Sequence, residues 1–241
     1  MYKTSVTGTT EEIHFNDKIV YRAERLDLNI SELKDSFAFV PYDHYFKEGR
    51  RYRTTSRIMI HDKGYELLER RPLYQPAYVN KLSSYGGIDR NYDDVPISLL
   101  QTRAFDEMIK SWTRSIPYPV KTFSIHQIRT TDDGNPTPEG AHRDGTDWTG
   151  IYIVNRYNIT DDSAATQYWT NDGSNRIDKV YPEGSLINHC DQYFTHCATP
   201  LKRLKEREPC FRDVFVLTSP EHGVNHEQEK YRKSVFVAED A

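Results

Sequence analysis

One short polar segment near the middle of the chain has the residue types and the spacing of a metal site. It reads EGAHRDG at residues 139–145. Residues i and i+2 of an extended backbone project to the same face, so His142 and Asp144 can hold one ion together. Two histidines and one carboxylate on one face of an octahedral ion leave three positions open, which suits Fe(II) oxygenases. The segment therefore predicts a non-haem iron site that needs a second histidine from elsewhere in the chain.

The residues that could complete this site lie further along, in an order that makes the pattern more specific. His196 stands in the run THCATP at 195–200, and Arg212 opens an apolar strand after a charged loop. A lone His-x-Asp occurs often by chance, whereas His-x-Asp followed by His and then by Arg does not. Such an arginine can pair with the distal carboxylate of a co-substrate whose other end chelates iron. We therefore expect His142, Asp144 and His196 to form a catalytic metal site.

Four motifs in the second half of the chain carry a resemblance to a known family: HQIR at 126–129, HRDG at 142–145, HCATPL at 196–201 and FRDVFVLT at 211–218. A fainter match continues upstream through YDHYFKEGRRYRTTSR at 42–57. Together these motifs resemble the bacterial L-isoleucine dioxygenase-like family of 2-oxoglutarate/Fe(II)-dependent free amino-acid hydroxylases. The resemblance implies a double-stranded β-helix core, with Fe(II), 2-oxoglutarate and O2 as cofactors. It also implies that His142, Asp144 and His196 bind iron and that Arg212 binds 2-oxoglutarate.

The chain departs from this family just before the second histidine. Ala164 and Ala165 stand where such enzymes often carry a Gly-Gly pair, and the aromatic run QYW follows at 167–169. The segment 220–241 also makes the C-terminus longer. Both differences affect the expected substrate pocket, so the resemblance predicts an amino-acid substrate without identifying the amino acid or the carbon that is oxidised.

Several polar and aromatic residues are candidates for contact with the substrate. A zwitterion buried beside iron needs a cationic partner and an acceptor, because unpaired buried charges are strongly penalised. His126 lies on the strand before the metal motif, where a histidine bonded to backbone is an equal alternative. Arg129 shares the strand face of Gln127, and the basic run at 50–53 is more often an exposed patch. The candidates for substrate binding are His126, Gln127, Arg129, Arg53 and Trp169, with Arg143, Asp147 and Tyr168 as further candidates.

Three other histidines, His222, His226 and His189, are also possible metal ligands. His222 and His226 are spaced for one face of a helix, but the Pro and Gly around them disfavour a helix, so a solvent-exposed loop is expected. His189 lies on the strand before His196 and is a rival third ligand. The sequence TPL after His196 and the position of Arg212 favour His196.

The periodicity of apolar residues predicts the elements that position these side chains. An apolar residue recurs at every fourth position from Leu100 to Trp112, which predicts a helix over 96–112. A shorter helix is expected after Asn29, with Ser31 as its N-cap. Later β-rich runs separated by turn residues predict a mainly β fold with flanking helices and a cupin-like jelly-roll core. The expected strands cover 120–129, 149–157, 164–170, 184–189, 192–199, 213–219 and 233–239, with loops at 130–140 and 201–209.

The length and the charge of the chain narrow the classes of protein. At 241 residues it fits a single domain, 1–241, in which 1–119 supplies supporting helices and strands, 120–219 the metal-binding core and 220–241 a C-terminal extension. A net charge of -4 without a polybasic block argues against nucleic-acid or membrane binding. The N-terminus has no secretory signal, and the three irregularly spaced cysteines are expected to be small buried residues in a reducing compartment. We expect a cytoplasmic location and a small-molecule substrate.

These observations predict an oxidoreductase, a dioxygenase that hydroxylates an unactivated C–H bond of a free L-amino acid or close derivative and releases succinate and CO2. A protein or peptide hydroxylase, or an oxidative desaturase or cyclase, would share the same metal residues. A zinc hydrolase also needs a positioned general base, which no motif supplies. A non-catalytic small-molecule-binding barrel is expected to lose a metal ligand, yet all the expected ligands are present.

Overall fold

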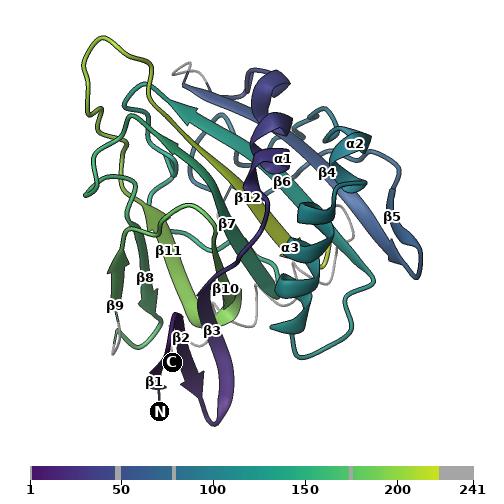
Figure 1. The fold of residues 1–241 in the computed structure, drawn as a ribbon, viewed down its shortest axis with the longest axis vertical. Helices are drawn as coiled ribbons and strands as arrows, with labels where there is room; N and C mark the ends of the chain where they lie inside the picture. The colour runs from purple at the N-terminus through teal and green to yellow at the C-terminus, as the bar shows by residue number, and fades with distance from the viewer. Residues whose placement is uncertain (1, 47–49, 78–79, 174–175, 223–241) are drawn as a thin grey trace.

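The computed structural model describes residues 2–46, 50–77, 80–173 and 176–222, which form two antiparallel sheets with helices packed on one side (Figure 1). The expectation of a mainly β fold with flanking helices is confirmed. The expected strand at 233–239, His226 and most of the segment 220–241 lie outside the described residues.

The larger sheet has nine strands in the order β1-β2-β3-β10-β7-β12-β6-β4-β5. Strand β12 lies between β7 and β6, so it connects the two halves of the sheet. The expected strands at 120–129, 149–157, 184–189 and 213–219 correspond to β6, β7, β10 and β12. In sheet order the bounds are β1 (Tyr2–Thr7), β2 (Thr10–Phe15), β3 (Lys18–Arg25), β10 (Ser185–Cys190), β7 (Trp148–Tyr157), β12 (Phe211–Ser219), β6 (Thr122–Thr131), β4 (Arg51–His61) and β5 (Gly64–Leu67).

The smaller sheet has the order β11-β8-β9, with β11 (Phe194–Ala198), β8 (Thr166–Thr170) and β9 (Arg176–Lys179). Strands β8 and β11 correspond to the runs expected at 164–170 and 192–199, and a short 3-10 turn, η2 (Asp191–Tyr193), joins β10 to β11. Figure 1 shows this sheet on the side of the molecule away from the helices.

The helices of the described residues are α1 (Ile30–Asp35), the 3-10 turn η1 (Ser36–Phe39), α2 (Ile97–Leu100) and α3 (Arg103–Arg114). The single helix expected over 96–112 is therefore two. The break has a local cause: Thr102 is the N-cap of α3, and its side chain accepts a hydrogen bond from the backbone N–H of Phe105. The helix after Asn29 begins at Ile30, so Asn29 rather than Ser31 is its N-cap.

Alternation along the central strands gives the larger sheet two faces with different roles. On β6 and β12 the even-numbered side chains, such as His126 and Arg212, line a cavity. The odd-numbered side chains face the helices, where Phe215 of β12 packs on Phe37 of η1 with ring centroids 5.1 Å apart. Because successive side chains of a strand point to opposite faces, the same strands supply both the core and the cavity wall.

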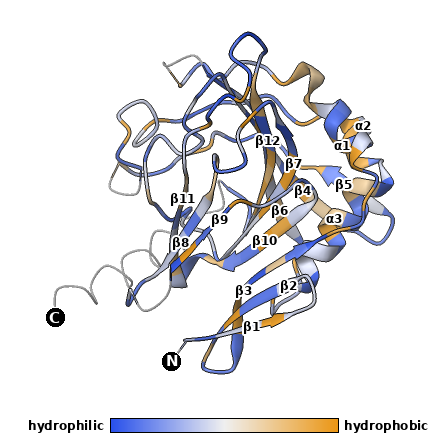
Figure 2. Cartoon of the chain, turned by 60° about the vertical axis from the view of Figure 1, so that its left-hand side comes forward, coloured by the Kyte–Doolittle hydropathy of each residue, from blue (hydrophilic) through white to orange (hydrophobic). Residues whose placement is uncertain are grey.

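The main core lies between α3 and the larger sheet, and the apolar residues of these elements stand out in Figure 2. Trp112 of α3 is fully buried and packs edge-on against Phe123 of β6, with centroids 5.4 Å apart. Gly150 of β7 permits this packing, because a Cβ atom there would lie 2.5 Å from the Trp112 ring. Among the described residues, no helix is both long and apolar enough to cross a membrane.

Candidate active site

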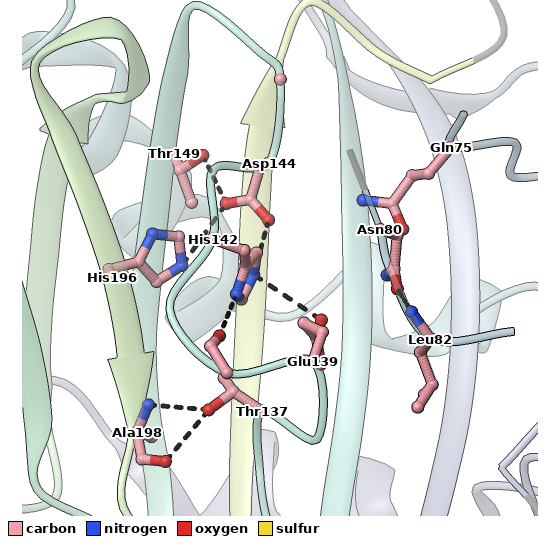
Figure 3. Close-up of polar contacts among 12 residues, drawn as sticks. Gln75, Asn80, Leu82, Thr137, Glu139, His142, Asp144, Thr149, His196 and Ala198 are labelled. Carbon is pink, nitrogen blue, oxygen red and sulfur yellow. Dashed lines mark hydrogen bonds and ion pairs between the residues drawn. The ribbon is translucent and has the colours of Figure 1, made fainter. Parts of the chain in front are cut away.

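Three side chains predicted as metal ligands meet at one end of the cavity (Figure 3). His142 and His196 form an isolated β-bridge through two backbone hydrogen bonds of 3.0 and 2.9 Å, which places their ring centroids 4.7 Å apart. The Asp144 carboxylate lies between them, with Oδ1 3.7 Å from His142 Nε2 and Oδ2 3.7 Å from His196 Nε2. The structure therefore brings His196 next to His142 and Asp144, which precede it by more than fifty residues in the sequence.

The segment that carries His142 is attached to β11. Thr137 accepts a hydrogen bond from the backbone N–H of Ala198 and donates one to its carbonyl oxygen, each 3.0 Å long (Figure 3). His142 Nδ1 contacts the carbonyl oxygen of Gly140 at 2.9 Å. This contact places a proton on Nδ1 and turns Nε2 toward Asp144, which is the orientation of a metal-ligating histidine.

The turn that carries Asp144 is held from behind by Asp191, a residue that the sequence pattern did not indicate. The buried Asp191 carboxylate accepts hydrogen bonds from the backbone N–H groups of Asp144 (2.9 Å) and Gly145 (2.8 Å). Gly145 has φ +74, a conformation that glycine adopts without strain. Thr149 of β7 donates to Asp144 Oδ2 at 3.0 Å and fixes the carboxylate itself.

The ionisation of these groups follows from their burial and from one another. Although burial opposes its charge, the neighbouring His196 and His142 hold the pKa of Asp144 below its usual value. Burial lowers the pKa of His196 to about 4, so this imidazole is neutral at pH 7. Burial also acts on His142, but Glu139 and Asp144 outweigh it and raise its pKa to about 9. A metal bound at His142 Nε2 therefore displaces a proton.

A second grouping of possible ligands overlaps this one. Atoms of Asp144, His189, Asp191 and His196 lie within 4.8 Å of one another. His189 is fully buried beneath the His196 ring, with Nδ1 3.3 Å from the Tyr168 hydroxyl, and the two oxygens of Asp191 accept backbone hydrogen bonds. Neither His189 nor Asp191 lines the cavity, whereas His142 does. His142, Asp144 and His196, by contrast, all line the cavity.

Arg212 lines the same cavity from β12. It is only 5% exposed, and its Nε has no hydrogen-bond partner. Among the described residues no carboxylate lies within ion-pairing distance of it. Burial and the nearby Arg156 lower its pKa to about 10, so the guanidinium is charged at neutral pH. The buried hydroxyl of Thr166 on β8 also lines the cavity without a partner. A buried cation without a counter-charge is costly, so this part of the cavity fits an anionic ligand.

Two candidates for substrate contact line the cavity. His126 lines the cavity, and its Nδ1 lies 3.0 Å from Arg53 Nη2 and 3.1 Å from the hydroxyl of Thr55, so its partners here are side chains rather than the backbone of the alternative expectation. Arg53 and its neighbour Arg51 are both buried on β4. The alternative of an exposed basic patch at 50–53 is therefore wrong for these two arginines.

Six other candidates do not line the cavity. Gln127 is on the helix-facing side of β6 and bonds to Thr54 and Ser36. Arg129, on the same side, binds the Asp213 carboxylate through hydrogen bonds of 2.7 and 2.8 Å. Strand alternation on β8 turns Trp169 outward, where it contacts Arg176, and Arg143 donates to Asn171. Asp147 and Tyr168 are also absent from the cavity lining, although Tyr168 packs on His196. The predicted substrate contacts Gln127, Arg129 and Trp169 thus lie outside the lining of this cavity.

The expectation of a solvent-exposed loop at His222 is wrong. His222 is buried, with Nδ1 2.7 Å from the Ser124 hydroxyl and Nε2 3.1 Å from the carbonyl oxygen of Arg71, and it lines the cavity. Glu139 lines it as well and places Oε1 3.7 Å from His142 Nε2, while its Oε2 is buried without a partner. Cys190, Cys197 and Cys210 are free thiols, and Cys190 and Cys210 are buried as expected.

A jelly roll with two histidines and one carboxylate at the end of a cavity defines a class of non-haem metal enzymes. The chain belongs to the 2OG-Fe dioxygenase family, whose sequence model matches residues 34–218. Its enzyme class is therefore that of dioxygenases that use Fe(II), 2-oxoglutarate and O2, which confirms the expected cofactors and the jelly-roll core.

Solved structures support the same fold at low sequence identity. A bsmA homolog from Methylobium petroleophilum PM1 has a TM-score of 0.66 and 22% identity, over 81% of this chain and 84% of that one. IDO from Bacillus thuringiensis has a TM-score of 0.59 and 15% identity, over 78% and 82%. The Fe(II)/(alpha)ketoglutarate-dependent dioxygenase TqaL has a TM-score of 0.56 and 17% identity, over 78% and 73%. No curated protein sequence matches this chain significantly.

Proposed function

We propose that the protein hydroxylates an unactivated C–H bond of a free L-amino acid or close derivative, releasing succinate and CO2. His142, Asp144 and His196 hold the iron, and Arg212 binds the distal carboxylate of 2-oxoglutarate. The main support is that a buried, unpaired Arg212 faces the same cavity as the three ligand side chains. When bound together, Fe(II), 2-oxoglutarate and O2 supply the oxidant for the C–H bond.

The residues of the chain position these groups and exclude water. Thr149 and Asp191 fix the Asp144 turn, and the Gly140 carbonyl fixes the His142 ring, so little rearrangement is needed when metal binds. Arg212 offers a guanidinium that no protein carboxylate neutralises among the described residues. A planar guanidinium matches a carboxylate in a two-pronged pair, and this sets the orientation of the co-substrate along the cavity.

An amino-acid substrate is supported by the polar groups beside the ligand cluster. Glu139 presents an unpartnered carboxylate oxygen that can accept from an ammonium group, and buried arginines on β4 can bind a carboxylate. The resemblance of the motifs at 126–129, 142–145, 196–201 and 211–218 to isoleucine dioxygenase-like enzymes supports the same substrate class.

Formation of succinate across a panel of free amino acids, compared with the same residues inside short peptides, tests this proposal. We expect succinate and a product with one added oxygen atom from a free amino acid. Product from peptides alone would place the protein among protein hydroxylases. A product that has lost hydrogen without gaining oxygen would instead indicate a desaturase or cyclase.

A further inference from the structure

Three buried arginines other than Arg212 line the cavity. Arg51 and Arg53 lie on β4, and Arg90 lies in the segment between β5 and α2. Thr130 of β6 pairs in register with both Arg212 of β12 and Arg51 of β4, so these two arginines occupy one row of the sheet. Their backbones are two strands apart, or about 10 Å. The three arginines thus form a separate cationic end of the cavity, called here the arginine end.

Arg51 and Arg90 both lie against the ring of Tyr85, with guanidinium carbons 5.9 and 4.4 Å from its centroid. Arg51 Nε and Nη1 and Arg90 Nε are buried without hydrogen-bond partners. Arg90 Nη2 donates to the side-chain oxygen of Gln75 at 2.7 Å, and Asn80 donates to the same oxygen at 3.1 Å. Gln75 and Asn80 are labelled in Figure 3. Arg90 is therefore held in place by an acceptor that carries no charge.

Arg53 differs from this pair because other side chains of the protein already contact its guanidinium. Its guanidinium bonds to His126 and Thr55 and stacks 4.9 Å from the ring centroid of Tyr92. Of the three arginines at this end of the cavity, Arg51 and Arg90 therefore keep side-chain N–H groups without a hydrogen-bond partner, and both lie against Tyr85.

The charges of the cavity do not cancel for a neutral substrate. At the metal end, Fe(II) and Arg212 balance Asp144 and the two carboxylates of 2-oxoglutarate. At the arginine end, the carboxylates of the described residues that act on Arg51 are those of Glu139, which also faces His142, and of the fully buried Asp43, which accepts from the hydroxyls of Tyr85 and Tyr92. Against the three guanidiniums, these two carboxylates leave one positive charge among the described residues, and burial of an uncompensated charge is strongly unfavourable.

We propose that the substrate is an amino acid whose side chain ends in a second carboxylate, and that this carboxylate binds between Arg51 and Arg90. Such a molecule carries one net negative charge, which cancels the excess at the arginine end. Its ammonium group then has Glu139 as an acceptor, and its two carboxylates have the arginines as donors. This inference rests on the proposed amino-acid hydroxylation and specifies its substrate class.

The test compares acids with their uncharged amides of equal size: aspartate with asparagine, glutamate with glutamine, and leucine as an aliphatic reference. Affinities are measured by calorimetry without oxygen, on protein loaded with Mn(II) and 2-oxoglutarate and on metal-free protein. We expect one acid to bind about 10- to 100-fold more tightly than its amide, the value of a charge-assisted hydrogen bond. The preference should persist without metal, because Arg51 and Arg90 act independently of it.

Variants that each remove one arginine charge test which arginines cause the preference for the acid over its amide. R51Q and R90Q should each weaken binding of the acid by about 10- to 100-fold, with binding of the amide and of 2-oxoglutarate unchanged. The matched control is R50Q, which removes an adjacent but exposed arginine and should leave the preference intact. If R90Q does not fold, R51Q and the unmodified protein still decide the question.

The outcomes separate this inference from the proposed function. Succinate formation with leucine or with an amide in preference to the acids overturns the acidic substrate and leaves amino-acid hydroxylation standing. Equal affinities of R51Q and unmodified protein for the acid also overturn it. Succinate formation with no free amino acid, combined with turnover of peptides, overturns the proposed function and this inference together.

Discussion

Arg212 is the residue in which charge, burial and position agree most closely on one role. It is a buried cation without a hydrogen-bond partner at Nε, and it shares a cavity with His142, Asp144 and His196. Arg129 is also an arginine on a neighbouring strand, but Asp213 neutralises it on the other face of the sheet. Two arginines with similar sequence contexts thus have different roles because strand alternation directs them to opposite faces.

Replacing Arg212 tests its role toward 2-oxoglutarate. Arg212→Ala should raise the concentration of 2-oxoglutarate that the enzyme needs, since loss of one partner of a buried charge-assisted pair costs about 2–5 kcal/mol. The apparent affinity for 2-oxoglutarate is read from succinate formation, and Mn(II) binding should stay the same. Arg212→Lys is the control that keeps the charge and loses the two-pronged geometry. Its apparent affinity for 2-oxoglutarate should therefore lie between those of Arg212→Ala and of unmodified protein. An unchanged affinity in Arg212→Ala would require a different anchor.

His142 predicts a pH dependence of metal binding. Glu139 and Asp144, acting against burial, raise its pKa to about 9, so the imidazole is protonated at pH 7 and must release a proton to bind metal. Metal affinity should therefore rise with pH, by up to ~tenfold per unit, until the pH reaches this pKa. Calorimetry of Mn(II) binding in buffers of different ionisation enthalpy measures the proton released. His142→Ala should bind weakly and lose this dependence, and a pH-independent affinity in unmodified protein would contradict the assignment.

At the scale of elements, the site depends on how one turn is supported. Asp191 of η2 accepts from two consecutive backbone N–H groups, and this ties the Asp144 turn to the link between β10 and β11. Asp191→Ala should lower metal affinity about 10- to 100-fold, as is typical when a group that orients a ligand is removed. Asp161→Ala removes an exposed carboxylate from the segment between β7 and β8 and should bind metal normally. Normal metal binding in Asp191→Ala would show that the turn holds its shape without this support.

The sequence predicts individual elements better than their boundaries. Runs rich in β-forming residues between turn residues identify β6, β7, β10 and β12, and most positions of these strands are buried on both faces of the sheet. The fourfold apolar repeat identifies the face of α3 but not the break at Thr102, because a cap is a local hydrogen bond that the apolar repeat does not record. Strand β9 has no buried face, so it gives no periodic signal.

The tertiary structure determines which residues come into contact, and no local sequence pattern contains this information. Arg51 and Arg212 share a row of the sheet only through the pairing of β4 and β12 with β6. The motif order predicts His142, Asp144, His196 and Arg212 because a metal site restricts residue types strongly. The arginine end has no such motif, so the buried state of Arg51 emerges only from the register of the strands, and that of Arg90 only from the packing of the segment between β5 and α2.

Because the proposed ligands come from both sheets and from the loop that joins β6 to β7, binding should stabilise the whole fold. His196 belongs to the smaller sheet, Arg212 to the larger one, and Asp144 to the segment between β6 and β7. A ligand present at 100 times its Kd contributes about 2.7 kcal/mol to the free energy of unfolding. For a chain of this length that corresponds to a rise in Tm of roughly 5–10 °C.

Thermal denaturation with Mn(II) alone and with Mn(II) plus 2-oxoglutarate separates the two contributions. Unmodified protein should show one increase with metal and a further increase with 2-oxoglutarate, both removed by a chelator. Arg212→Ala should keep the first increase and lose the second, because only the distal carboxylate has lost its partner. His196→Ala should lose both, since without metal the co-substrate has no chelating centre. A full 2-oxoglutarate increase in His196→Ala would show that the co-substrate binds independently of the metal, and would contradict the assignment of this cavity.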